Sequence, residues 1–135
     1  MEDQVLNDLL LKTRRIYIKL SEFEDLTKQL AEAVTRRDEV SVQMLLNMRG
    51  EPASQMAEID QQLRSSLLQL PVEDAIRAKE ILEGDEKQRP EEEMLCNQVK
   101  QNQRLIQRCK EMDRRISLSM DSKHSFYTKF REAKH

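Results

Sequence analysis

The residues best suited to covalent or metal chemistry are few and far apart in this sequence. Cys96 and Cys109 fall on one predicted helix, about 20 Å apart along its axis, so they cannot form a disulfide with each other. His124 and His135 are distant from both cysteines and show no spacing typical of metal ligands. We therefore expect two free structural thiols, as in a reducing compartment, and neither a metal site nor a cofactor.

Carboxylates are numerous, but their spacing on predicted helical faces gives no pair that burial would hold at different pKa values. The sequence has no Gly-rich phosphate loop, no nucleophile elbow and no His-Glu metal motif. Its two glycines, Gly50 and Gly84, are too few for a set of catalytic loops. We expect the carboxylates to form a solvated surface and the protein not to be an enzyme.

The C-terminal segment indicates protein binding most strongly. Phe126, Tyr127 and Phe130 are close together and lie among basic residues such as Lys129 and Arg131. Aromatic side chains beside positive charge are good anchors in protein interfaces. Two interpretations stay open: the aromatic side chains dock onto a partner, or Phe126 and Phe130, one helical turn apart, fasten the last helix to its own bundle.

The charge distribution argues against two other classes of partner. The 23 basic and 25 acidic residues are spread along the chain and leave a formal net charge of −2, so nothing attracts nucleic acid or an anionic membrane. The longest apolar run, 9–11, is far shorter than the roughly 20 residues of a membrane span. The opening MEDQ lacks the basic start of a secretory signal. We expect a cytoplasmic protein without a membrane span.

The composition predicts an all-α fold. Leu, Glu, Gln, Lys, Arg and Met dominate, and there are 2 glycines and 3 prolines. Since 36% of the residues are charged, we expect an elongated antiparallel helical bundle rather than a deep round core. One domain, 1–135, is predicted, with helices at about 3–36, 38–70, 72–83 and 91–132. Apolar residues keep helical phase across 50–52, which favours one kinked helix there over two helices and a loop.

Polar residues interrupt the apolar stripes of the predicted first and last helices. Thr13 and Thr27 occupy stripe positions of the first helix and are expected to weaken its packing locally. Asn102 and Asp113 do the same in the last helix. Either these two residues lie at a hydrated edge or set the register, or the last helix presents part of its stripe to a partner.

The sequence combines a long first helix, an Arg-Asp break, a second helix, and a long last helix with an Asn-x-x-Leu element. The positions that define this layout are Leu20, Phe23, Leu26, Leu30, Ala33, Arg37-Asp38, Leu45-Leu46, Arg49, Asn102 and Leu105-Ile106. The layout resembles that of the FlgN-type flagellar export chaperones, small helical proteins of bacteria. The sequence departs from the family at 50–52, where a smoother helix is usual, and in its basic aromatic tail.

The resemblance implies a chaperone that keeps hook–filament junction proteins soluble and delivers them to the type III export gate. The disordered C-terminal region of the client would complete a bundle that the chaperone leaves partly open. Tyr127 is the implied gate contact by its position. Two alternatives stay open, a homo-oligomeric coiled-coil scaffold and a helical regulatory adaptor. The implied client contacts lie along the last helix: Leu105, Ile106, Cys109, Met112, Ile116 and Met120.

Overall fold

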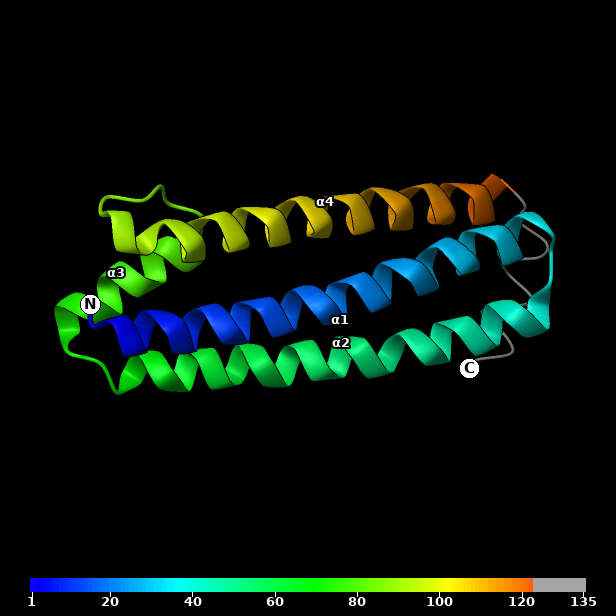
Figure 1. Ribbon diagram of the computed structural model, residues 1–135. Helices are drawn as coiled ribbons and strands as arrows, with labels where there is room; N and C mark the ends of the chain where they lie inside the picture. The colour runs from blue at the N-terminus through cyan, green and yellow to red at the C-terminus, as the bar shows by residue number, and fades with distance from the viewer. Residues whose placement is uncertain (123–135) are drawn as a thin grey trace.

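The protein is an elongated bundle of long helices (Figure 1). The computed structural model describes residues 1–122. It contains α1 (Asp3–Thr35), α2 (Glu39–Leu68), α3 (Val72–Leu82), a single 3-10 turn (Pro90–Glu92) and α4 (Glu93–Ser122). No strand occurs between residues 1 and 122, and the predicted all-α fold is confirmed.

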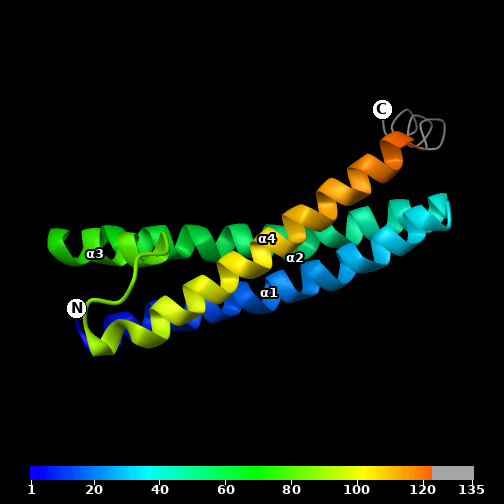
Figure 2. The same ribbon diagram turned by 90° about the horizontal axis from the view of Figure 1, so that it is seen from above.

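α1 is the central helix of the bundle. It packs extensively against both α2 and α4, which lie on either side of it (Figure 1). α1 and α2 form an antiparallel hairpin, whereas α4 runs in the same direction as α1 and crosses the hairpin obliquely (Figure 2). The short α3 lies at the end of the bundle where α1 begins. The bundle is therefore antiparallel in its hairpin and parallel between its first and last helices.

The helix ends agree with the predicted boundaries to within two residues wherever both can be compared. The turn between α1 and α2 uses Arg37 in the left-handed region, with φ of 57°. Asp38 then caps α2, because its Oδ1 accepts a hydrogen bond from the backbone N–H of Ser41 at 3.1 Å. The predicted extension of the last helix to residue 132 lies outside the described residues.

α2 runs without a break through Gly50, Glu51 and Pro52. Proline has no N–H to donate to the preceding turn, so its helical position costs one backbone hydrogen bond. Pro52 is buried, and helical phase is kept on both sides of it. The prediction of one helix rather than two helices and a loop is confirmed.

Three clusters of buried side chains follow one another along α1. The first joins Leu9 to Leu63 of α2, Ile81 of α3 and Leu95 of α4. Burial of one such side chain stabilises the fold by roughly 1.5–3 kcal/mol, because its apolar surface is removed from water. α1 supplies residues to every cluster and so fixes where its neighbours lie. The second cluster is Leu20, Leu105 and Cys109, and the third includes Leu30, Ala33, Val34, Val42, Leu45, Ile116 and Met120.

The two threonines on the α1 stripe are buried without an unsatisfied hydroxyl. Thr13 donates its Oγ1 hydrogen to the Leu9 carbonyl at 2.7 Å, and Thr27 donates to the Phe23 carbonyl at 2.8 Å. A buried hydroxyl that is hydrogen-bonded within its own helix avoids most of the desolvation cost. Thr13 and Thr27 therefore weaken the packing of α1 only because they bury less apolar surface than a larger apolar side chain would.

Candidate binding groove

An apolar groove of about 860 Å³ opens between α2 and α4, with α1 as its floor. Thr13, Ile16 and Leu20 of α1 form the floor, and α3 closes one end. The lining of the α2 wall extends from Met56 to Leu68, which is about 18 Å or three helical turns at 1.5 Å per residue. The groove therefore has the length of a short helical segment. The other apolar lining residues are Leu63, Leu67, Ala75, Ile76, Leu82, Val99 and Ile106.

Asn102 is the buried polar residue of the α4 wall. Its Nδ2 donates to the Thr13 carbonyl at 2.9 Å, and its Oδ1 accepts a hydrogen bond from Gln98 at 3.0 Å. Only 6% of Asn102 is exposed, yet both ends of its amide have a partner. The amide therefore fixes the register of α4 against α1 beside the groove, in agreement with one of the two interpretations of this residue.

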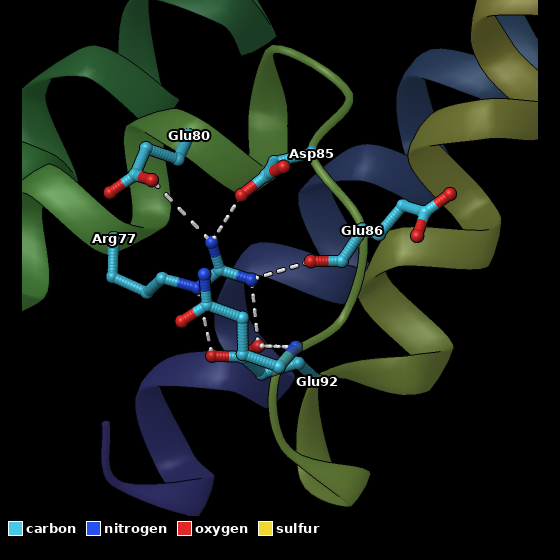
Figure 3. A network of polar contacts seen from close by, with 6 residues as sticks. Arg77, Glu80, Asp85, Glu86 and Glu92 are labelled. Carbon is cyan, nitrogen blue, oxygen red and sulfur yellow. Dashed lines mark hydrogen bonds and ion pairs between the residues drawn. The ribbon is translucent and has the colours of Figure 1, made fainter.

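Arg77 holds α3 in place at the end of the groove (Figure 3). Its Nε and Nη2 donate to the two carboxylate oxygens of Glu92, at 3.1 and 2.9 Å, while its Nη1 donates to Asp85 at 2.7 Å. Arg77 also reaches the backbone carbonyl of Glu86 at 2.8 Å. One guanidinium thus ties α3 to the 83–89 connection and to the start of α4.

Glu92 is buried, with 4% of its surface exposed. The hydrogen bonds from Arg77 are the main cause that lowers the pKa of this carboxyl to about 2, and they raise the pKa of Arg77. The backbone N–H of Gln88 also donates to Glu92 at 2.9 Å. The expectation of a wholly solvated carboxylate surface is therefore wrong at Glu92.

A second polar bridge crosses from α2 to α4 farther along the bundle. Arg49 Nη1 donates to Asp113 Oδ1 at 2.7 Å and to Thr27 Oγ1 at 3.1 Å. The Arg49 guanidinium carbon lies 4.8 Å from the centroid of the Phe23 ring. Arg49 Nε is buried without a hydrogen-bond partner. Asp113 therefore sets the register of α4 against α2. Its carboxylate is paired with Arg49 inside the protein, so it does not indicate a surface left open for a partner.

The predicted site residues of the last helix are mostly turned toward α1. Leu105, Cys109, Ile116 and Met120 are buried in the clusters built on α1, and Met112 packs beside them. Ile106, partly buried, lines the groove. Phe126, Tyr127 and Phe130 lie outside the described residues.

The two cysteines are free and buried. Burial is the main cause that raises the pKa of both thiols, Cys96 and Cys109, so neither is a ready thiolate. No group of three or more His, Cys, Asp or Glu side chains in residues 1–122 is placed to hold a metal ion. Across the same residues, no helix is both long and apolar enough to cross a membrane.

The sequence reasoning missed the contribution of α2 and α3 to this groove. Leu68, Val72 and Ile76 are 87%, 75% and 57% exposed, and all three lie at the corner between these helices. Leu68 and Ile76 also line the groove, so the corner forms an exposed apolar lip. The available signal was the doubled Leu67-Leu68 at the end of α2, which places one leucine beyond the buried stripe.

The groove combines an apolar lining with polar side chains such as Lys79, Glu83 and Gln103, which suits an amphipathic segment better than a small polar molecule. Its floor and walls are held by the Asn102 amide and by the Arg77 and Arg49 bridges, so the trough is preformed. Compared with known proteins, the chain has no match to a protein-family model, to a curated protein or to a solved structure.

Proposed function

We propose that this protein is a chaperone-type binding protein that holds an amphipathic helix of another protein in the groove between α2 and α4. The observation that carries the proposal is the apolar groove of about 860 Å³, which all four helices line. A helix laid along α1 there would take the fourth position of a bundle, which α3 occupies at one end. Such a helix would present apolar residues at i, i+3 or i+4, and i+7.

The exposed lip supports the same proposal. Leu68 and Ile76 line the groove and are exposed, and Val72 is exposed at the start of α3, between them in the sequence. Contiguous exposed apolar surface is characteristic of sites that bind another protein. A bound helix would cover this lip with its own apolar residues as it left the groove.

The resemblance to FlgN-type chaperones supplies the proposed partner. The bound segment would be the disordered C-terminal region of a hook–filament junction protein, held in the cytoplasm until delivery to the flagellar type III export gate. Ordering such a segment costs about 2–5 kcal/mol of the interaction energy, so the complex would be of moderate affinity and releasable. Release is what a delivery chaperone requires.

The buried state of the last-helix stripe changes where the client would bind. Leu105, Cys109, Ile116 and Met120 already pack against α1, and opening that contact would cost the bundle its core. The proposed client contact is instead the groove face, to which Ile106 contributes together with Ile16, Leu67 and Ile76.

The test is calorimetric titration of the protein with peptides from the C-terminal regions of hook–filament junction proteins, with the mass of each complex measured by light scattering. The matched variants are Ile76→Glu in the groove and Ile18→Glu on the outer face of α1, since these side chains are 57% and 55% exposed. We expect Ile76→Glu to weaken binding by about tenfold or more, roughly 1.4 kcal/mol, and Ile18→Glu to leave it unchanged.

Two results would contradict this proposal. Equal loss of binding in both variants would mean that the groove is not the site. A protein that binds none of the peptides and forms a stable oligomer through the groove face would instead support the homo-oligomeric scaffold.

A further inference from the structure

We infer that the helix bound in this groove has an acidic polar face, which lies along a rim of basic side chains from α3 and α4. This inference rests on the proposed function, and it adds the charge of the partner segment. The basic rim consists of Lys79 on α3 and Lys100, Arg104 and Lys110 on α4.

The charge of α4 is strongly one-sided where the helix borders the groove. No acidic residue occurs between Glu93 and Glu111, a stretch that contains Lys100, Arg104, Arg108 and Lys110. The chain as a whole has a formal net charge of −2, so this local excess is not a general property of the surface. Complementary charge across an interface steers association and selects partners.

The basic rim borders the groove directly. Lys100, Arg104 and Lys110 surround a shallow depression on α4 together with Gln103 and Ile106. Gln103 and Ile106 also line the apolar groove, so the two surfaces are continuous. Lys79 lines the groove itself, from the α3 end. An occupant whose apolar side rests on α1 would therefore turn its flank toward these four cations.

Most of the rim charges have no ion-pair partner among the residues that the structure describes. Lys79, Arg104 and Lys110 form no ion pair among residues 1–122, and Lys100 has only a 4.0 Å contact with Glu86, which is itself exposed. Arg108 differs, because its Nε donates to Glu24 of α1 at 3.0 Å. The rim thus keeps its charge available for a ligand.

The acidic residues that line the groove belong to α2 and to the end of α3, not to α4. Asp60 is paired with Arg64 on α2 at 2.9 Å, one turn apart on the same helix. Glu83 is exposed and stands at the α3 end of the lining. The α4 wall therefore faces the groove mouth with positive charge alone.

A helical peptide fits these features better than a nucleic acid does. Single-stranded nucleic acids use aromatic side chains as stacking platforms beside basic residues, and no aromatic side chain is among the described residues that line the groove. Leucine-type side chains on the floor and cations at the edge match the two faces of an acidic amphipathic helix.

The test uses designed helical peptides that share one leucine stripe and differ only in the polar face, which carries Glu, Gln or Lys. Binding to the 135-residue protein is measured by fluorescence anisotropy at low and at high salt. We expect the Glu peptide to bind about tenfold or more tighter than the Lys peptide at low salt, with the Gln peptide between them. The difference should shrink at high salt because exposed charges are screened.

The variants reverse charge at matched places. Arg104→Glu with Lys110→Glu reverses part of the rim, while Arg14→Glu with Arg15→Glu makes the same change in net charge at exposed residues of α1. We expect the rim variant to lose the preference for Glu over Lys, and the α1 variant to keep it. Thermal unfolding of each variant checks that the fold is kept.

The outcomes separate this inference from the function on which it rests. Equal binding of all three leucine-stripe peptides, unchanged in the rim variant, would overturn the acidic partner and leave the groove as a helix site. No binding of any peptide would overturn both. An acidic peptide with serines in place of its leucines is the last probe: if it binds as tightly as the Glu peptide, the rim is a general anion site and the inference is wrong.

Discussion

Individual polar residues decide how the helices of this bundle are aligned. The Asn102 amide is buried between α1 and α4, and its Nδ2 bonds the Thr13 carbonyl. An apolar side chain there could pack at several offsets, whereas one amide bonded to one carbonyl specifies a single register. A buried polar residue of this kind trades some stability for uniqueness. The sequence predicts that Asn102 lies on the apolar stripe of the last helix, but it does not identify the carbonyl to which the amide donates.

Glu92 makes the stability of the protein sensitive to acid. The hydrogen bonds from Arg77 hold the pKa of this carboxyl at about 2, below the usual glutamate pKa of 4.5 that it would have in an unfolded chain. A group with a depressed folded pKa stabilises the fold fully above its unfolded pKa and loses that contribution as the pH falls toward the folded value. We predict that Glu92→Gln lowers the free energy of unfolding by on the order of 2–3 kcal/mol at pH 7. Urea unfolding measures this change.

The pH dependence gives the diagnostic result. The difference between the natural protein and Glu92→Gln should narrow as the pH falls from 4.5 to about 2. Glu91→Gln is the matched control, since Glu91 is exposed in the same turn and has no ion pair among the described residues. A difference that stays constant over this range would show that packing, and not the ion pair, accounts for the loss.

At the scale of the element, the two glycines have opposite roles. Gly50 is exposed in the interior of α2, and a Cβ added there would meet nothing within 4 Å. Gly84 has φ of +105°, and its Cβ would come within 2.6 Å of the Gln103 side chain. We predict that Gly50→Ala raises the free energy of unfolding by about 0.5–1 kcal/mol, because alanine loses less entropy in a helix.

Gly84→Ala should lower the free energy of unfolding by about 1 kcal/mol or more, because an L-residue is strained at that φ. Chemical denaturation of both variants, analysed with a common slope, measures the two changes. If both substitutions shifted stability in the same direction, either Gly50 would not be helical within α2, or Gly84 would not adopt a positive φ after α3.

The link between α2 and α4 is tested by a double-mutant cycle at Arg49 and Asp113. Asp113→Ala alone should cost about 1–3 kcal/mol, because it removes the 2.7 Å partner of a largely buried guanidinium. Arg49→Met with Asp113→Ala should recover part of that loss, since Arg49 Nε already lacks a partner and no charge is left uncompensated. If the losses of the two single variants simply added in the double variant, Arg49 and Asp113 would have no interaction energy with each other.

The elements were predictable from the sequence, whereas their partners were not. Helical periodicity identified each helix, and it identified the buried side of the long helices α1, α2 and α4, because burial of one face imposes that spacing on the residues. It did not identify the buried side of α3, where Ala78 and Ile81 are buried while Val72 and Ile76 are exposed. The stripe of Leu105, Cys109 and Ile116 would look the same whether α1 or a client covered it. Likewise, periodicity could not predict the contact between Arg77 and Glu92, because that contact depends on how the 83–89 connection folds back.

At the scale of the whole molecule, the groove follows from the central position of α1. One helix that packs on two neighbours leaves those neighbours apart, and here the space between α2 and α4 is filled by α3 only at one end. Residues on three helices, such as Ile16, Leu67 and Ile106, then face one trough. No local sequence pattern predicts this groove, because it depends on how α4 crosses the hairpin of α1 and α2.

The groove ends well before the described end of α4. The last groove residue on α4 is Ile106, and the helix continues to Ser122, about 24 Å farther along its axis. We therefore predict that replacing Phe126, Tyr127 and Phe130 together by alanine in the 135-residue chain leaves the affinity for a groove-bound peptide unchanged. Anisotropy titration of the natural protein and the triple variant compares the two affinities.

The same triple variant tests whether the tail has its own partner. If the tail docks at an export gate, as the resemblance implies for Tyr127, the variant should keep its peptide binding and lose binding to a purified gate component. If the tail instead fastens the bundle, the variant should unfold at a lower temperature and bind the peptide more weakly. The two interpretations predict opposite results for peptide binding, and the gate-binding and unfolding assays then show which role the tail has.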